Sequence, residues 1–263
     1  MQGKNLILRK NFAMRIEYLE ELGSTNAYLL EKEENKRVGM VVYARMQTAG
    51  KGMGTNVWES APGLNLTFSM GFDMSFMRAE DQFLLSQAVP LGLLDGLDML
   101  DMLKLNGEEP YRTLSVKWPN DLYYGDRKLC GILINSSIHG MMMGASVVGI
   151  GLNVNQIVFR DWPTHPISLK VILGKELALE PLLEHLVATV EQRVSMLKTD
   201  EGIAKIKADY LHRLYRYRIW ADYEVDGQKV KRFITGIDAF GRLKTLDETG
   251  NEYVSDLRTI RYL

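Results

Sequence analysis

Residues 47–58 are the first segment whose residue types and spacing could do chemistry. Three glycines lie within five residues, at Gly50, Gly52 and Gly54, so backbone amides there can approach a ligand closely. Successive exposed N–H groups form a concavity that favours anions, and Lys51 adds a full positive charge. The spacing differs from that of a P-loop and of the dinucleotide fingerprint. The segment predicts a phosphate-binding loop, and a plain flexible loop is the alternative.

A lysine at the end of an apolar strand pattern is the second candidate. Lys117 follows Val116 and precedes Trp118-Pro119. Lysine is seldom buried unless it is paired or contacts a ligand. The alternative is an edge-strand lysine whose stem packs on Trp118 while its ammonium reaches water. Both interpretations stay open on these residues alone.

Alternating glycines mark a third segment, residues 149–155. Gly149 and Gly151 leave one face of a strand without side chains, which suits a flat ligand; a bulge or tight packing against a helix is the alternative. Trp58 follows the glycine loop closely, but a lone aromatic is more often a core residue than a stacking platform. The four histidines have no metal-ligand spacing and Cys130 has no partner, so we expect no structural zinc site.

Apolar periodicity and turn residues outline the elements that must position these segments. We predict strands over residues 16–19, 38–46, 64–72, 114–118, 128–138 and 142–154. We predict helices from Ser24 or Thr25 to about residue 34, over 79–103 with a bend near Pro90, and over 181–197 and 201–214. Residues 121–127 are predicted to form a turn. The order lacks the regular strand–helix alternation of a doubly wound fold, so we expect an α+β domain with a mixed sheet.

The pattern changes after residue 214. Short alternating segments are broken by Asp226-Gly227, Phe240-Gly241 and Thr249-Gly250, at a spacing of about ten residues. Such punctuation favours a small β-barrel or sandwich. We therefore expect a larger domain over residues 1–214 and a smaller one over residues 215–263.

Composition limits the class of protein. The 263 residues include 46% hydrophobic and 25% charged side chains, with a formal net charge of -1. These values are ordinary for a soluble globular protein and give no electrostatic reason to bind nucleic acid. One cysteine fits a reducing compartment. We find no signal peptide and no apolar stretch of ~18–20 residues, so we expect a cytoplasmic protein without a membrane partner.

Taken together, four blocks of residues resemble the catalytic module of biotin–protein ligases over about residues 16–160. The blocks are Ser24-Thr25-Asn26, Gln47 through Trp58, Lys117-Trp118-Pro119-Asn120-Asp121 with Lys128-Leu129-Cys130-Gly131-Ile132-Leu133, and Gly149-Ile150-Gly151-Leu152-Asn153. Each block is weak alone, whereas the joined Lys-Trp-Pro-Asn-Asp and Lys-Leu-x-Gly-Ile-Leu blocks are specific. The resemblance implies a mixed β-sheet catalytic domain flanked by helices, similar to class II synthetases, and a small SH3-like β-barrel at the C-terminus.

The resemblance also implies a two-step reaction that uses ATP and Mg2+, with the metal bound together with ATP and not at a protein-only site. The carboxylate of biotin attacks the α-phosphate and gives biotinyl-5′-adenylate and pyrophosphate. A lysine of a biotin carboxyl-carrier protein, or of the carrier domain of a biotin-dependent carboxylase, then attacks the adenylate and releases AMP. Relatives are monomers or homodimers. The C-terminal barrel would close the ATP site or dock the acceptor.

Individual residue roles follow from the same resemblance. Lys117 and Lys51 would be the catalytic residues, with Lys117 touching both the biotin carboxylate and the α-phosphate. The implied biotin-binding residues are Ser24, Thr25, Asn26, Gln47, Gly50, Lys51, Gly52, Met53, Lys117, Gly131, Gly149 and Gly151. The implied ATP-binding residues are Lys51, Met53, Asn56, Trp58, Lys117, Asn120 and Asn153. We therefore expect Lys117 and the loop around Lys51 to meet in one cavity.

Two departures from the family pattern concern the loop and the start of the chain. The family loop commonly reads Gly-Arg-Gly followed by Arg, whereas this chain has Lys51, Met53 and Asn56. We expect the loop to hold the adenylate mostly through backbone amides. The Ser-Thr-Asn block begins at Ser24, which leaves no room for a winged-helix domain, so we expect a monofunctional enzyme that does not bind DNA. A lipoate–protein ligase and a non-catalytic biotin- or adenylate-binding sensor are the alternatives.

Overall fold

The computed structural model describes residues 5–6, 14–99, 114–160 and 165–263. Its larger sheet has eight strands in the order β1-β2-β3-β4-β8-β7-β6-β5. In chain order these are β1 (Asn5–Leu6), β2 (Arg15–Leu22), β3 (Met40–Gln47), β4 (Leu66–Asp73), β5 (Leu114–Lys117), β6 (Asp121–Tyr124), β7 (Arg127–His139) and β8 (Met142–Leu152). Strands β2 and β3 are parallel and the other neighbours are antiparallel. The predicted mixed sheet is confirmed.

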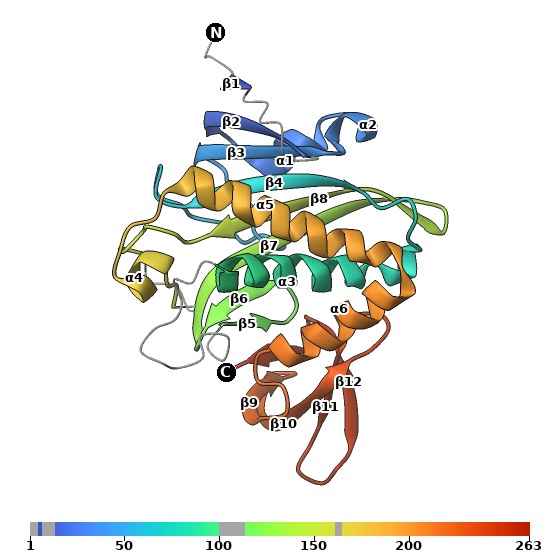
Figure 1. Ribbon diagram of the computed structural model, residues 1–263. Helices are drawn as coiled ribbons and strands as arrows, with labels where there is room; N and C mark the ends of the chain where they lie inside the picture. Colours follow the sequence, from blue (N-terminus) through green and yellow to red (C-terminus); the bar gives the residue numbers. More distant parts are fainter. Residues whose placement is uncertain (1–4, 7–13, 100–113, 161–164) are drawn as a thin grey trace.

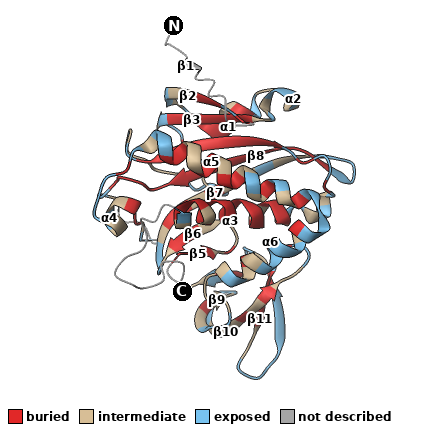
Figure 2. Cartoon of the chain, viewed as in Figure 1, coloured by how far each residue is buried: buried red, intermediate tan, exposed pale blue. Residues whose placement is uncertain are grey.

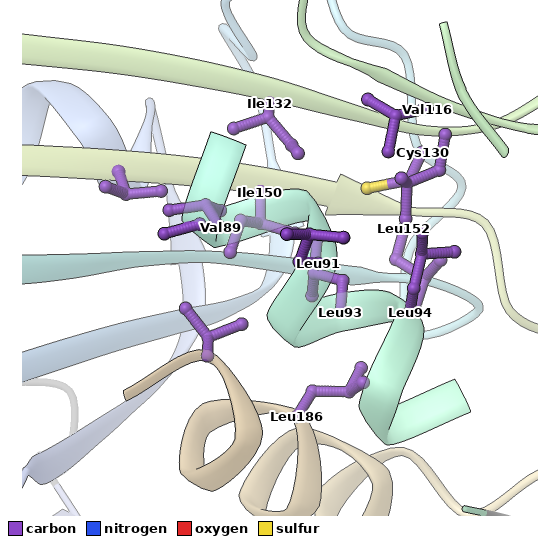
Figure 3. Close-up of a cluster of buried hydrophobic side chains, with 14 of the residues drawn as sticks. Val89, Leu91, Leu93, Leu94, Val116, Cys130, Ile132, Ile150, Leu152 and Leu186 are labelled. Atoms are coloured by element: carbon purple, nitrogen blue, oxygen red, sulfur yellow. The ribbon is translucent and has the colours of Figure 1, made fainter. Parts of the chain in front are cut away.

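Long helices cover one face of this sheet (Figure 1). They are α3 (Phe83–Met99), α5 (Leu179–Ser195) and α6 (Asp200–Arg213). The predicted helix over 79–103 corresponds to α3, and its last residues, 100–103, lie outside the described residues. Helix α3 is buried on most of its surface (Figure 2). Its residues Val89 and Leu91 belong to one apolar cluster with Ile132 and Ile150 of the sheet (Figure 3).

The other face of the sheet carries the short helices α1 (Thr25–Leu30) and α2 (Glu34–Arg37). Successive side chains of β3 point to opposite faces of the sheet. Val41 belongs to the apolar cluster of the long helices, whereas Val42 packs with Leu29 of α1. A strand buried on both faces has a continuous apolar pattern, as β3 does. The Ser24 hydroxyl accepts a hydrogen bond from the Ala27 N–H at 3.4 Å and so caps α1.

Residues 121–124 form a strand, so the predicted turn over 121–127 was too long. Strand β6 pairs with β5 on one side and with β7 on the other. Only Gly125 and Asp126 form the turn. Leu122 and Tyr123 are both buried, and burying two large side chains outweighs the turn preference of the polar residues around them.

The C-terminal part forms a separate antiparallel sheet of five strands in the order β12-β11-β10-β9-β13. These are β9 (Trp220–Val225), β10 (Gln228–Ile237), β11 (Leu243–Leu246), β12 (Glu252–Ser255) and β13 (Ile260–Tyr262). Asp226 and Gly227 have φ of 51° and 76°, the left-handed conformation that a tight hairpin turn requires. The sheet is consistent with the predicted SH3-like domain. The short helix α4 (Leu169–Leu173) follows β8 along the chain.

Candidate functional site

A cavity of about 210 Å³, which we call the main cavity, lies between the start of α1, the glycine loop and strands β7 and β8. Its lining residues are Ser24, Thr25, Asn26, Gln47, Lys51, Gly52, Met53, Asn56, Val57, Trp58, Asn120, Asp121, Lys128, Gly131, Ile132, Leu133, Gly149, Ile150 and Gly151. The Ile132 and Ile150 side chains belong to the core on the α3 side (Figure 3). Side chains alternate along a strand, so the neighbouring glycines at 131, 149 and 151 present bare backbone to the main cavity. We call these three residues the glycine floor.

This bare backbone lies against the indole of Trp58. A Cβ built at Gly151 would lie 2.6 Å from the indole nitrogen, and one built at Gly131 would lie 2.8 Å from the ring. Both distances are shorter than van der Waals contact, so a side chain at either position would displace the ring. Among the described residues, the buried indole nitrogen of Trp58 has no hydrogen-bond partner.

One end of the main cavity is polar and already ordered. The Thr25 N–H donates to Oε1 of Gln47 at 2.7 Å, and the Thr25 hydroxyl lies 3.2 Å from the same oxygen. That hydroxyl also lies 2.9 Å from the hydroxyl of Ser69. Asn26 donates from Nδ2 to the Leu133 carbonyl at 3.4 Å. These bonds orient the side chains in advance, so this end can pair a small polar ring with little rearrangement.

Lys128 supplies a positive charge to the main cavity, and sequence reasoning did not assign it to the site. Its Nζ lies 2.8 Å from Oδ1 of Asp121 and 5.7 Å from the centroid of the Trp58 ring. The two paired side chains are only 21% and 16% exposed. A charge so enclosed is costly without a partner. The available signal was a lysine three residues before the floor glycine Gly131.

Lys117 does not line the main cavity, which corrects the expectation that it meets the Lys51 loop there. Its Nζ donates to the Tyr123 hydroxyl at 3.0 Å and lies 4.7 and 5.0 Å from the ring centroids of Tyr123 and Tyr262. Burial lowers the pKa of the Lys117 ammonium, although Asp121 opposes that shift. Lys117 lies opposite Asp121 across β5 and β6, and its ammonium lies against β13 of the C-terminal sheet.

A second cavity of about 310 Å³, which we call the side cavity, adjoins the main cavity at Trp58. Its lining residues are Asn56, Val57, Trp58, Glu59, Lys128, Asn153, Gln156, Phe159, Arg160 and Pro166. Four of these, Asn56, Val57, Trp58 and Lys128, line both cavities. Asn153 donates from Nδ2 to the Ile167 carbonyl at 3.1 Å and so holds the chain that follows β8. Lys128 is therefore a cation at the boundary of two adjoining spaces.

The structure brings most of the assigned residues together. Of the assigned set, Gly50, Lys117 and Asn153 do not line the main cavity, and the others do. Gly50 closes the loop, because its carbonyl accepts from the Trp58 N–H at 3.0 Å and an added Cβ would collide with the Trp58 carbonyl. Asn120 lines the main cavity, but its Nδ2 donates to the Ile132 carbonyl at 2.7 Å. Within the described ranges, no group of three or more His, Cys, Asp or Glu side chains could hold a metal ion.

Comparison with known proteins gives a family match over the part of the chain that lines the main cavity. The family model described as Biotin/lipoate A/B protein ligase family matches residues 18–154. The Bifunctional ligase/repressor BirA of Escherichia coli is 36% identical over 238 residues, which cover 88% of this chain and 66% of that protein. The chain thus spans about two thirds of the length of that relative. The Biotin--protein ligase of Homo sapiens is 30% identical over 82% of this chain and 29% of that protein.

Solved structures share the fold over nearly the whole chain. A biotin protein ligase from Aquifex aeolicus, in complex with biotin and ATP, aligns with a TM-score of 0.74 at 22% identity, covering 94% of this chain and 99% of that one. A biotin protein ligase from Leishmania major, in complex with biotin, aligns with a TM-score of 0.61 at 20% identity, covering 92% and 98%. The predicted resemblance and fold class are confirmed.

Proposed function

Because this chain belongs to the biotin/lipoate A/B protein ligase family, we propose that it is a biotin–protein ligase. It activates biotin with ATP to biotinyl-5′-AMP and pyrophosphate, and then transfers the biotinyl group to a lysine of a biotin carboxyl-carrier protein or domain. The observation that carries this proposal is the position of Lys128, which borders both the main cavity and the side cavity. A reaction that joins two anions needs such a cation between their binding spaces.

Biotin fits the main cavity in one orientation. Its ureido ring needs hydrogen-bond partners, and the polar end offers Ser24, Thr25, Asn26 and Gln47. Its fused rings need a flat surface, and the glycine floor offers one where Trp58 now lies. The carboxylate then points away from the polar end toward Lys128. This orientation requires the Trp58 ring to leave the floor when biotin enters.

ATP fits the side cavity, with its phosphates directed toward Lys128. A carboxylate and a phosphate about 4 Å apart repel each other by roughly 4 kcal/mol at an effective dielectric constant of about 20. Lys128 at the boundary offsets much of this repulsion, and Lys51 of the loop adds a second positive charge beside the main cavity. The Lys128–Asp121 pair can exchange partners, since an incoming phosphate replaces the carboxylate as the neighbour of the ammonium.

The residues present also suit the Mg2+ that accompanies ATP. Magnesium bound with nucleotides usually takes one or two protein carboxylates, with phosphate oxygens and waters as its remaining ligands. Asp121 is a carboxylate in the lining of the main cavity, close to Lys128 at the boundary with the side cavity. Asp121 would hold the ion, and the bound ion would supply further screening of phosphate charge.

The polar end favours biotin over lipoate. The dithiolane ring of lipoate has no N–H or carbonyl groups, so it would leave the polar groups of Thr25 and Gln47 without ligand partners. A site built to pair a polar ring discriminates against an analogue that lacks the polar groups, by about 10⁴-fold in favourable cases. A sensor that binds biotin alone would have no use for a lysine between two cavities.

One assay tests the proposal against these alternatives. The purified chain is mixed with Mg-ATP, a biotin carboxyl-carrier domain and either biotin or lipoate, and the mass of the carrier is measured. We expect a mass increase with biotin and none with lipoate. No increase with biotin would refute the proposed function. An increase with lipoate alone would identify a lipoate ligase, and tight biotin binding without any increase would identify a sensor.

We further propose a cytoplasmic ligase that acts as a monomer or homodimer. The single cysteine, Cys130, is buried and unpaired, as suits a reducing compartment. The described residues contain no helix that is long and apolar enough to cross a bilayer. A net charge of -1 gives no electrostatic support for DNA binding.

A further inference from the structure

Two consecutive residues of the β5–β6 hairpin contact the C-terminal sheet. The indole N–H of Trp118 donates to the Gly241 carbonyl at 2.8 Å, and this contact is buried. The Lys117 ammonium lies 5.0 Å from the centroid of the Tyr262 ring in β13. The hairpin therefore touches the C-terminal sheet at two points next to each other in sequence, one at each side of the peptide bond between residues 117 and 118.

Tyrosine rings enclose the Lys117 ammonium. Tyr123 accepts its hydrogen bond at 3.0 Å and also presents its ring face at 4.7 Å. Tyr215 connects the two flanking rings, with its centroid 5.5 Å from that of Tyr123 and 5.8 Å from that of Tyr262. A desolvated ammonium between aromatic faces is held by cation–π attraction, which a neutral side chain of the same length cannot supply.

The far side of the same hairpin forms a wall of the main cavity. Asp121 lies opposite Lys117 in the β5–β6 ladder and pairs with Lys128. Asn120 holds Ile132 through two bonds, from its own Nδ2 to the Ile132 carbonyl and from the Ile132 N–H to its own carbonyl. Any rotation of the hairpin therefore changes the position of the Asp121–Lys128 pair.

We propose that Lys117 is a positioning residue, through which the C-terminal sheet sets the Asp121–Lys128 pair in the main cavity. The inference rests on the proposed function, in which Lys128 stands between carboxylate and phosphate. Two lysines in adjoining blocks of the sequence thus have different roles. Lys128 touches the substrates, whereas Lys117 acts through the β5–β6 hairpin.

Kinetics of single and double variants test this role. Lys117→Met keeps the length of the stem and removes the charge, and Tyr262→Leu removes the ring. Each should lower kcat for pyrophosphate release about tenfold, the loss expected for one desolvated cation–π contact. Each should weaken the biotin Kd, measured by calorimetry, by a smaller factor than kcat falls, because the polar end that pairs the ureido ring lies outside the hairpin. The double variant should lose no more than either single one, because both remove the same contact.

Conservative and control variants sharpen the test. Lys117→Arg should retain activity within about threefold, because a guanidinium also binds aromatic faces. Tyr262→Phe keeps the ring and should behave as the parent does. Tyr253→Leu, on the exposed strand β12 of the same sheet, should also be silent. If Lys117→Met does not fold, as judged by circular dichroism, Lys117→Arg and Tyr262→Leu decide the question.

Several results would overturn the inference. Parent-like kinetics of Tyr262→Leu, losses that multiply in the double variant, or a loss of biotin affinity larger than the loss of kcat in Lys117→Met would each do so. Failure of the proposed function is distinct, because the parent chain itself would then release no pyrophosphate with biotin. In that case amide hydrogen exchange still decides: Lys117→Met and Tyr262→Leu should both speed exchange of residues 114–124 about tenfold, and unchanged exchange would overturn the positioning role.

Discussion

Adding a single methyl group to the cavity floor tests where the flat ligand lies. In Gly151→Ala the new Cβ would stand 2.6 Å from the indole nitrogen of Trp58 and 2.7 Å from Cζ2 of the same ring. Ordinary van der Waals contact begins at 3.4 Å and the nearest ring atom, Cε2, is closer still, so the ring must retreat by about 1.1 Å. Trp58 belongs to an irregular loop and is only half-buried, so it can move at small cost to stability, below about 1 kcal/mol.

A bound ligand has less freedom to move than the loop. If the fused rings of biotin lie on the glycine floor, the methyl group lifts them away from the polar end at Thr25 and Gln47. A misfit of one methyl group in a binding pocket costs about 1–3 kcal/mol, which corresponds to a 10–200-fold weaker Kd. We therefore expect Gly151→Ala to bind biotin 10–200-fold more weakly in isothermal titration calorimetry, with a melting temperature near that of the parent.

The matched control is Gly236→Ala in strand β10. A Cβ built there meets no atom within 4 Å, and the position does not require positive φ. This variant should bind biotin as the parent does. Equal biotin affinity of Gly151→Ala and Gly236→Ala would refute the placement of the ligand on the floor. A large drop in melting temperature for Gly151→Ala would instead refute the idea that the Trp58 loop yields easily.

Three further predictions concern the loop, the boundary lysine and the helices. Lys128→Met should lower the rate of adenylate formation about 100- to 1,000-fold, the range seen when one preorganised electrostatic group is removed, while the exposed control Lys205→Met stays active in the same pyrophosphate assay. Met53→Arg should slow adenylate release if the loop now holds the adenylate mostly through backbone amides; a rate that does not slow contradicts this. Arg193→Met removes the partner that Asp95 and Asp209 share. Because the Asp95 side chain is 35% exposed, the free energy of unfolding, measured in urea, should fall by about 2 kcal/mol, less than for a fully buried pair.

Local patterns were sufficient to predict most elements of the fold. The apolar run at 38–46 became β3, and the periodic segment from 79 became α3. The three dipeptides that predict turns after residue 214, Asp226-Gly227, Phe240-Gly241 and Thr249-Gly250, each lie between strands. These features depend on side chains within a few positions of each other, which is the range over which periodicity and turn chemistry act. The strand at 121–124 was missed because it has only four residues and adjoins a turn, while its burial depends on strands β5 and β7 and on Tyr215.

The lining of the main cavity was predicted in outline, except for the position of Lys117 and the presence of Lys128. The glycine floor was predictable because glycines inside a strand usually mark a close approach by a ligand or another backbone. The polar end was predictable because serine and threonine mark the start of a helix. The choice between Lys117 and Lys128 depends on which side of a twisted hairpin each ammonium reaches. The Lys117 ammonium lies against Tyr262, a residue near the other end of the chain, and no local pattern contains this information.

The environments of the two lysines support the different roles that we propose for them. Lys128 is paired with a carboxylate, so an incoming phosphate can replace Asp121 as its partner while Asp121 becomes available to a cation. Lys117 is held by tyrosine rings and a neutral hydroxyl, which have no comparable anion to replace, and burial lowers its pKa. Moving Lys117 to a substrate would remove the cation from two tyrosines, Tyr123 and Tyr262, and open the contact with the C-terminal sheet. Partner exchange is inexpensive at Lys128 and disruptive at Lys117, so the substrates should meet Lys128.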